Sequence, residues 1–233
     1  MLDIQCKPEN IQEWEGFAKI MQIVHQYFPK EFIQYDDPDS IATSKDFLRF
    51  KDLLVIGGEK TGKTNFLKQM INAVLLKYRS PEIVIFNPFN KDSYEEFADT
   101  ADIIIHPEDS LGILDKCWSG TSTGGNMFIY IDSANTLIEK DEPRFVNAIK
   151  RILEYPGGNI WIYMATTGKY SSLPEDIRAM FQNRIIFKIP ECCDAIMSEI
   201  LAGTEDAEMI GDYEFLLYEK GTTTLYKNPP QGF

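Results

Sequence analysis

Eight consecutive residues, Gly57 to Thr64, have the types and spacing of a phosphate-binding loop, or P-loop. They read GGEKTGKT and fit the pattern G-x-x-x-x-G-K-[ST], between the apolar run LLVI and a helical pattern. A phosphate chain is bound by several backbone N–H groups that point into one concavity, and glycines permit the dihedral angles of so tight a loop. The helix that follows adds unpaired N-terminal donors and the positive end of its dipole. The sequence therefore predicts a site for the phosphates of a nucleotide.

Different side chains of this loop are expected to contact the phosphates and the magnesium ion of a nucleotide complex. Lys63 is expected to neutralise the β- and γ-phosphates, and the Thr64 hydroxyl is expected to ligate Mg²⁺. Lys60 is a candidate second phosphate contact, with a solvated loop lysine as the alternative, and Glu59 places an opposing negative charge nearby. The residues expected to bind the nucleotide, ATP, are Gly57, Gly58, Lys60, Thr61, Gly62, Lys63, Thr64 and Asn65.

A P-loop ATPase also needs an acidic residue at the end of another strand, where it completes the magnesium shell. The apolar run MFIYI, residues 127–131, ends at Asp132 and supplies this residue; the alternative is a strand that merely leaves the core. We therefore expect Thr64 and Asp132 to hold Mg²⁺. The next residue is Ser133, where a hydrolysing motor usually carries a glutamate that orients water. The chain could thus bind ATP and turn it over slowly or not at all.

Strand-like and helix-like segments alternate around these residues. Strands are expected at 53–56, 83–86, 103–106, 127–131, 160–165 and 184–189, and helices at 63–78, 94–98, 111–118, 143–154 and 175–182. Strands separated by helices of this length imply parallel pairing, right-handed crossovers and helices on both faces. Two β-rich runs, 213–218 and 222–226, flank a glycine and predict a C-terminal hairpin. The predicted fold class is α/β, a doubly wound, mostly parallel sheet with a C-terminal β-hairpin.

The N-terminal part has a different pattern. Residues 10–28 carry apolar side chains in steps of three and four, which predicts an amphipathic helix. Residues 29–44 mix prolines and aspartates with little periodicity and predict an irregular segment. We therefore divide the chain into residues 1–46, a helix and lead-in segment that pack on the core, and residues 47–233, the P-loop domain.

The composition of the chain argues against several classes of protein and of binding partner. The 233-residue chain is 44% hydrophobic and 25% charged, values that are typical of a globular protein. No apolar run is long enough to span a bilayer, and the N-terminus lacks the apolar core of a secretory signal. The net charge of −13 disfavours binding to duplex DNA, which is a dense line of phosphates. The four cysteines have no CxxC spacing, which favours reduced thiols over zinc or disulfides.

Three motifs, in their order along the chain, resemble the FtsK/SpoIIIE branch of hexameric P-loop translocases, whose fold is of the RecA/FtsK type. They are GGEKTGKT, FIYIDS at 128–133, and MATTGKYSSLPEDIRAMFQNRIIFKI at 164–189. In that family a strand ending in Ala-Thr-Gln is followed by a helix and a Ser-Arg-Ile-Ala-Phe strand. The resemblance implies that Thr167 occupies the polar sensor position in place of glutamine. It also makes Arg184 a candidate for a sensor or inter-subunit role, against the alternative of a surface ion pair.

Within that branch the chain is most similar to the last ATPase domain of the type VII secretion coupling protein, a membrane-anchored motor of the EssC/YukBA kind. Residues 13–39 resemble the segment that leads into each ATPase module of such proteins, and degenerate Walker B and sensor positions are typical of the C-terminal module. The resemblance implies a domain of a larger membrane protein, at the cytoplasmic face of the cell membrane. Its implied partners are neighbouring ATPase domains of the same chain, a homo-hexameric ring, and secreted helical-hairpin proteins of the WXG100 type.

Two other functions remain open at this point. A pseudo-ATPase that serves as an interaction or regulatory module is favoured by Ser133 and Thr167. A double-stranded DNA translocase is favoured by the superfamily alone, and the acidic charge opposes it. A nucleoside or shikimate-type kinase shares the P-loop, but no paired lid arginines follow in a recognisable place.

Overall fold

The computed structural model describes most of the chain from Phe47 onward. The described residues are 47–88, 91–104, 107–117, 125–156, 159–167, 173–188, 210, 214–219 and 222–227. The predicted N-terminal helix and lead-in segment, residues 1–46, lie outside them. The division of the chain at residue 46 therefore stays a prediction. Within the described part, no helix is both long and apolar enough to cross a bilayer.

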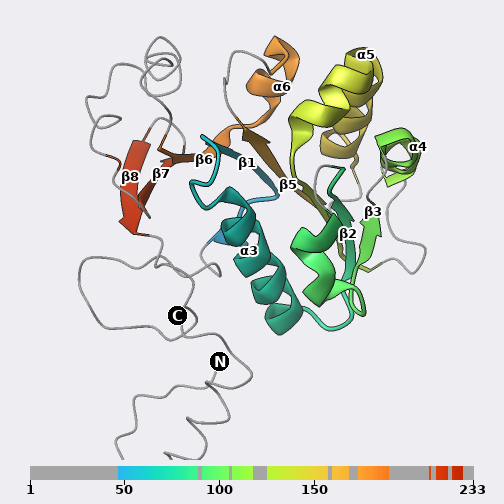
Figure 1. Ribbon diagram of the computed structural model, residues 1–233, viewed down its shortest axis with the longest axis horizontal. Helices are drawn as coiled ribbons and strands as arrows, with labels where there is room; N and C mark the ends of the chain where they lie inside the picture. Colours follow the sequence, from blue (N-terminus) through green and yellow to red (C-terminus); the bar gives the residue numbers. More distant parts are fainter. Residues whose placement is uncertain are drawn as a thin grey trace, which may run out of the picture.

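One sheet of eight described strands forms the centre of the fold, in the order β3-β2-β4-β5-β1-β6-β7-β8 (Figure 1). The strands are β1 (Asp52–Gly57), β2 (Glu82–Phe86), β3 (Asp102–Ile104), β4 (Met127–Ile131), β5 (Ile160–Thr167), β6 (Asn183–Phe187), β7 (Glu214–Glu219) and β8 (Thr222–Lys227). The six from β3 to β6 pair in parallel, whereas β6, β7 and β8 pair antiparallel. The predicted α/β class, with a mostly parallel sheet and a C-terminal hairpin, is confirmed.

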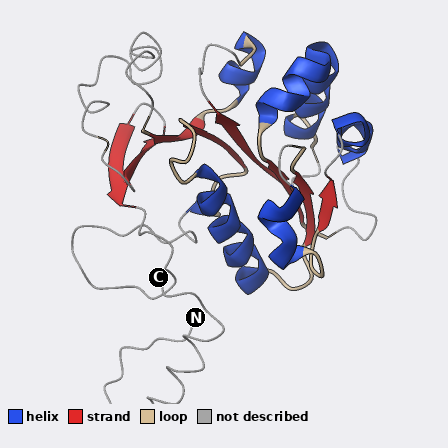
Figure 2. Ribbon diagram, viewed as in Figure 1, coloured by secondary structure: helices blue, strands red, loops and turns tan. Residues whose placement is uncertain are grey.

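Helices cover both faces of the sheet (Figure 2). The 15-residue α3 (Lys63–Lys77) and the short 3₁₀ helix η2 (Lys91–Phe97) pack on one face, and α4 (Pro107–Cys117), α5 (Ala134–Leu153) and α6 (Glu175–Met180) pack on the other. Alternate residues of each strand enter the two cores: in β1, Leu53 and Val55 pack toward α3, while Leu54 and Ile56 pack toward α5. A strand buried on both faces is a continuous apolar run, which is the pattern seen in the sequence.

The parallel strands bring their C-terminal ends to the same edge of the sheet. Strand β5 lies between β1 and β4, and its register pairs Gly57 with Thr167 and Ile131 with Met164. The P-loop after β1 and Asp132 after β4 therefore lie at one edge, separated by the width of a single strand. Ligands of open α/β sheets bind at this carboxyl edge.

Helix α5 begins nine residues before the helix predicted at 143–154. The backbone of Asp141, with φ −161° and ψ 84°, interrupts it, and Pro143 follows inside the second part. Proline is favoured in the first turn of a helix, so the pattern correctly indicated a start there. It missed the earlier part, where Ala134, Leu137 and Ile138 are buried at helical spacing, because the polar run EKDE follows directly.

The segment predicted as a helix at 94–98 is instead the 3₁₀ helix η2. Its backbone is kinked at Tyr94, where φ is −127° and ψ is 18°. A 3₁₀ helix has 3.0 residues per turn and occurs in short pieces, so it differs from the expected α-helix in its side-chain spacing. The Tyr94 ring is fully buried in the core beside α3.

An aromatic cluster joins the C-terminal hairpin to the P-loop helix. It consists of Phe47, Phe66, Phe187, Phe215 and Tyr226. The Phe66 ring lies 5.3 Å from Phe47, 6.1 Å from Phe187 and 5.6 Å from Phe215, all nearly edge to face. Such pairs add about 0.5–1.5 kcal/mol each beyond the area they bury. The cluster thus fixes α3, which carries Lys63 and Thr64, against β6 and β7.

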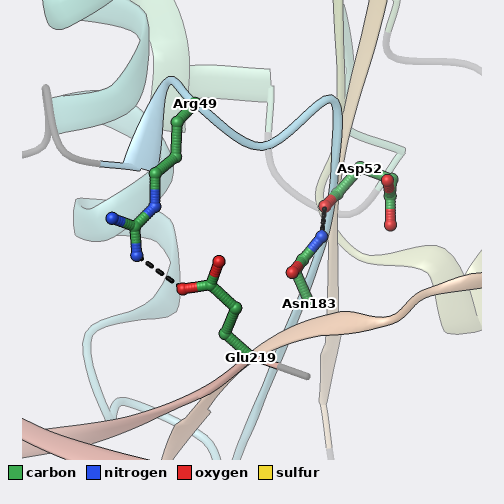
Figure 3. Close-up of polar contacts among 4 residues, drawn as sticks. All are labelled: Arg49, Asp52, Asn183 and Glu219. Atoms are coloured by element: carbon green, nitrogen blue, oxygen red, sulfur yellow. Dashed lines mark hydrogen bonds and ion pairs between the residues drawn. The ribbon is translucent and has the colours of Figure 1, made fainter. Parts of the chain in front are cut away.

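Polar contacts connect neighbouring strands at the edge of the sheet where the parallel strands begin (Figure 3). Arg49 pairs with Glu219 at 2.6 Å, and the Asn183 amide donates to the backbone oxygen of Asp52 at 3.4 Å. Burial raises the pKa of the Asp52 carboxyl, and its Oδ2 is buried without a hydrogen-bond partner among the described residues. These contacts tie the start of β1 to β6 and β7.

Candidate nucleotide-binding site

The P-loop is built by backbone conformations that favour glycine. Gly62 has φ 105°, in the left-handed region, and precedes the first residue of α3. Lys60 also has a positive φ, 58°, which costs about 1–2 kcal/mol for a residue with a Cβ. The Thr61 hydroxyl donates to the Gly58 carbonyl at 2.9 Å and braces this turn. The loop therefore adopts the tight curve that the motif predicted.

Gly57 is required for a steric reason. A Cβ on this residue would lie 2.7 Å from Thr61 Oγ1 and 2.8 Å from the Cβ of Phe187. Both distances are shorter than real Cβ contacts, and the second neighbour is a strand residue that cannot move freely. The chain can pass between β6 and the loop at this point only without a side chain.

The Lys63 side chain folds into the loop that precedes it. Only 6% of the residue is exposed, and Nζ donates to the carbonyls of Gly57 at 3.1 Å and Gly58 at 2.5 Å. An ammonium has three donors, so one proton remains for a phosphate oxygen. Burial lowers the pKa of Lys63 to about 8, while Asp132 and Glu59 act in the opposite direction. A buried cation with a free donor is suited to an anionic ligand.

Thr64 and Asp132, the two predicted magnesium ligands, are in direct contact. The Thr64 hydroxyl donates to Asp132 Oδ2 at 2.7 Å, and the aspartate is 8% exposed. When the Thr64 proton is directed to the carboxylate, the oxygen lone pairs are left for a metal. Hydroxyl and carboxylate oxygens are the ligands that Mg²⁺ prefers, and the ion usually takes only one or two protein groups besides phosphates and water. The donor set therefore fits Mg²⁺.

Tyr94 completes this group and was not identified from the sequence. Its hydroxyl donates to the same Oδ2 of Asp132 at 2.9 Å. Burial, and next the negative charge of Asp132, raise the pKa of the tyrosine well above its ordinary value. Nothing in the residues around position 94 forms a motif, because the contact depends on how η2 packs beside β4.

Asn135 links the end of β4 to the end of β5. Its side-chain oxygen accepts hydrogen bonds from the Ser133 hydroxyl at 3.0 Å, the Thr166 hydroxyl at 2.8 Å and the Thr167 backbone N–H at 2.9 Å. Thr167, the predicted sensor residue, is thus held through its backbone at the same edge as the P-loop. The Ser133 hydroxyl donates to the Asn135 amide oxygen. Position 133 therefore lacks the carboxylate with which a glutamate would orient water. Asn135 was also missed from the sequence, since an asparagine in a first helical turn is common.

Arg184 lies away from the other predicted site residues. It pairs in register with Leu54, three residues before Gly57, so it lies toward the opposite edge of the sheet. Its guanidinium donates to the carbonyls of Phe181 at 3.1 Å and Arg178 at 3.0 Å, just after and within α6. The sensor or inter-subunit role of Arg184 stays a prediction.

Comparison with known proteins gives matches by structure only. No family model and no curated protein matches the sequence. The conjugation coupling protein TcpA of pCW3, in its monomer form with ATPγS, gives a TM-score of 0.64 at 14% identity, over 76% of this chain and 59% of that chain. The DNA-packaging ATPase B204 of Sulfolobus turreted icosahedral virus gives 0.60 at 18% identity, over 77% and 98%. The cytoplasmic domain of the Thermomonospora curvata type VII secretion ATPase EccC gives 0.60 at 14% identity, over 76% and 25%.

These similarities show that the chain has the fold shared by TcpA, B204 and the EccC ATPase. The chain spans 59% of the TcpA chain and 25% of the EccC chain, so it corresponds to a part of each. Structures of the genome packaging NTPase B204 from Sulfolobus turreted icosahedral virus 2 contain ATPγS or AMPPCP, and a second EccC structure contains ATPases 2 and 3 with a signal sequence peptide.

Proposed function

We propose that this chain is a nucleotide-binding P-loop ATPase domain that takes ATP with Mg²⁺. The observation that carries the proposal is the convergence of the buried Lys63 ammonium with the Thr64–Asp132 pair at the carboxyl edge of the sheet. The backbone donors of residues 59–65 would surround the phosphates, since the Gly58 N–H already donates to the Lys188 carbonyl at 3.0 Å, and Lys63 would neutralise them. TcpA and B204, which share the fold, have been seen with ATP analogues.

Magnesium, when bound, would neutralise phosphate charge and orient the phosphate chain. Thr64 and Asp132 would hold it. Lys63 would contribute a buried positive charge. Lys60 lies exposed on the loop, where it can reach a phosphate or remain in solvent.

Hydrolysis by this domain is proposed to be slow. The position after Asp132 holds Ser133, whose hydroxyl is bonded to Asn135, and no carboxylate takes the water-orienting position there. The domain would then act mainly as a nucleotide-dependent regulatory module. Turnover by the isolated, assembled domain at a rate typical of competent enzymes, roughly 10 s⁻¹ or faster, would contradict this point.

We propose further that the domain belongs to a type VII secretion motor, as part of a longer membrane-anchored chain. The motif resemblance, the EccC-like fold and the net charge of −13 support this assignment. Its partners would be neighbouring ATPase domains, a hexameric ring and secreted helical-hairpin proteins of the WXG100 type, at the cytoplasmic face of the membrane. DNA translocation is the second candidate, because TcpA is a conjugation protein and B204 packages DNA.

Thermal unfolding tests the nucleotide proposal. A ligand that binds only the folded state stabilises it by about 2.7 kcal/mol at a hundred times its Kd. ATP with Mg²⁺ should therefore raise the Tm of the wild-type chain by several degrees and leave that of Lys63→Ala unchanged. Lys60→Ala is the matched control, since it removes an exposed lysine from the same loop and should retain most of the shift. Equal shifts in all three proteins would show that the P-loop does not bind the nucleotide.

A further inference from the structure

Tyr94 connects a segment outside every recognised motif to the proposed metal site. The tyrosine is fully buried, and its hydroxyl and that of Thr64 both donate to Oδ2 of Asp132, at 2.9 Å and 2.7 Å. On the basis of the proposed function, we infer that Tyr94 is a positioning residue: it orients Asp132, and through it the Thr64 hydroxyl, for Mg²⁺. The inference concerns how the metal site is organised, whereas the proposed function concerns only that it exists.

The reason lies in the geometry of the Thr64 hydroxyl. Its lone pairs face a metal only when its proton points elsewhere, and Asp132 Oδ2 is the acceptor that holds this proton. A carboxylate that accepts one bond can rotate about its Cβ–Cγ bond, whereas a second donor fixes which oxygen faces Thr64. Groups that orient a metal ligand in this way typically change metal affinity by about 10–100-fold when removed.

Tyr94 is itself held in place from two sides. Its ring packs against Phe97, with centroids 6.4 Å apart, and the Lys68 ammonium lies 5.7 Å from the ring centroid. Lys68 also pairs with Glu96 at 2.8 Å, which ties η2 to α3, the helix that carries Thr64. A tyrosine hydroxyl has an ordinary pKa of about 10, so it is a donor at physiological pH. Tyr94 and Thr64 thus lie on two elements, η2 and α3, that the Lys68–Glu96 ion pair connects.

The alternative is that Asp132 merely satisfies a buried tyrosine. Loss of the hydroxyl would then lower stability, because a buried carboxylate oxygen loses a donor, but it would not change the dependence of binding on magnesium. The quantity that separates the two cases is the magnesium advantage, defined as the Kd for ATP in EDTA divided by the Kd with Mg²⁺.

The experiment measures this ratio by fluorescent-ATP binding for the full chain and two variants. Tyr94→Phe keeps the ring and removes only the hydroxyl. Tyr163→Phe is the matched control: it is also fully buried, and its hydroxyl donates to the Phe50 carbonyl at 3.2 Å, toward the other edge of the sheet. We expect Tyr94→Phe to lose about tenfold or more of the magnesium advantage with its Kd in EDTA unchanged, and Tyr163→Phe to keep both values.

Each result decides the inference. An unchanged magnesium advantage in Tyr94→Phe, or none in the wild-type chain, overturns it and leaves nucleotide binding standing. No ATP binding by the wild-type chain in either buffer overturns both proposals. If Tyr94→Phe does not fold, hydrogen exchange on the unmodified chain decides: Mg²⁺·ATP should slow exchange across residues 94–98 more than ATP in EDTA does. Equal exchange in the two states would refute the positioning role.

Discussion

At the scale of single residues, the charges around the P-loop oppose each other. Lys63 is a buried cation inside the loop, and Glu59 is an exposed anion on its rim. The first favours phosphates and the second repels them. We therefore expect pH to change the attraction that the buried Lys63 exerts on phosphates, and salt to change the repulsion that the exposed Glu59 exerts on them.

Binding of ATP should weaken as the pH rises through the Lys63 pKa of about 8, a value lowered by burial. Phosphates favour the ammonium form. Below this pKa the ammonium is already present, so the affinity is at its maximum; above it, binding must take up a proton, and the Kd should rise by up to about tenfold per pH unit. Calorimetry between about pH 7.5 and pH 9.5 measures this slope.

Lys63→Arg provides the control for this pH dependence, because a guanidinium stays charged throughout the range. Its Kd should be weaker but flat with pH. The same slope in Lys63→Arg and in the wild-type chain would mean that another group titrates.

Glu59→Gln should bind ATP more tightly than the wild-type chain. An exposed charge near the phosphates contributes roughly 1 kcal/mol or less in water, so we expect a gain of about two- to fivefold at low salt. The gain should shrink at about 1 M salt, where the screening length is about 3 Å. Glu139→Gln makes the same change in net charge on the exposed side of α5 and should leave the Kd unchanged. Comparable gains in both variants would point to net charge rather than to Glu59.

The residues that the sequence could identify are those that belong to a recognisable motif. Residues 57–64 form the predicted loop because the glycines, lysine and threonine act within eight positions, and the Thr64–Asp132 contact follows from a strand that ends in aspartate. Tyr94 and Asn135 could not be identified, since neither belongs to a motif and their bonds to Asp132 and Thr166 arise only from the packing of elements. Such contacts depend on packing, which periodicity does not encode.

At the scale of elements, β1 and α3 hold the P-loop between them, so its backbone tolerates little change. The positions of the parallel strands followed from their apolar runs, and the hairpin followed from its glycine turn. The start of α5 did not, because a polar run inside the helix conceals its first turns. The 3₁₀ helix η2 could not be predicted either, because its kinked backbone does not space side chains as an α-helix does.

Gly57→Ala should disrupt this junction. The added Cβ would lie within 2.8 Å of Thr61 Oγ1 and Phe187 Cβ, so the loop or β6 must move. We expect a loss of about 1–3 kcal/mol in the free energy of unfolding, together with weaker ATP binding. Urea denaturation and nucleotide titration measure the two effects.

Gly112→Ala is the matched control for Gly57→Ala. It lies within α4, where the nearest neighbour of an added Cβ is an Arg144 side-chain nitrogen at 3.9 Å. Alanine favours the helix by about 0.8–1.0 kcal/mol over glycine, so this variant should be more stable and bind ATP normally. Destabilisation by both substitutions, or by neither, would contradict the steric account.

At the scale of the whole molecule, the net charge bears on the choice between the two proposed roles. A chain with 36 acidic and 23 basic residues should not bind duplex DNA unless its basic residues are concentrated on one surface. We expect no shift in fluorescence anisotropy of a labelled duplex at about 50 mM salt, where phosphate contacts are strong. Salt-dependent binding that persists at physiological ionic strength would favour the DNA translocase over the secretion motor.

The central claim is that the loop from Gly57 to Thr64 binds the phosphates of ATP, and isothermal titration calorimetry with ATP and Mg²⁺ tests it most directly. We predict one saturable site in the wild-type chain, and no measurable heat of binding in folded Lys63→Ala. The absence of binding heat in the folded wild-type chain at millimolar ATP and Mg²⁺, or equal binding by Lys63→Ala, would contradict the claim.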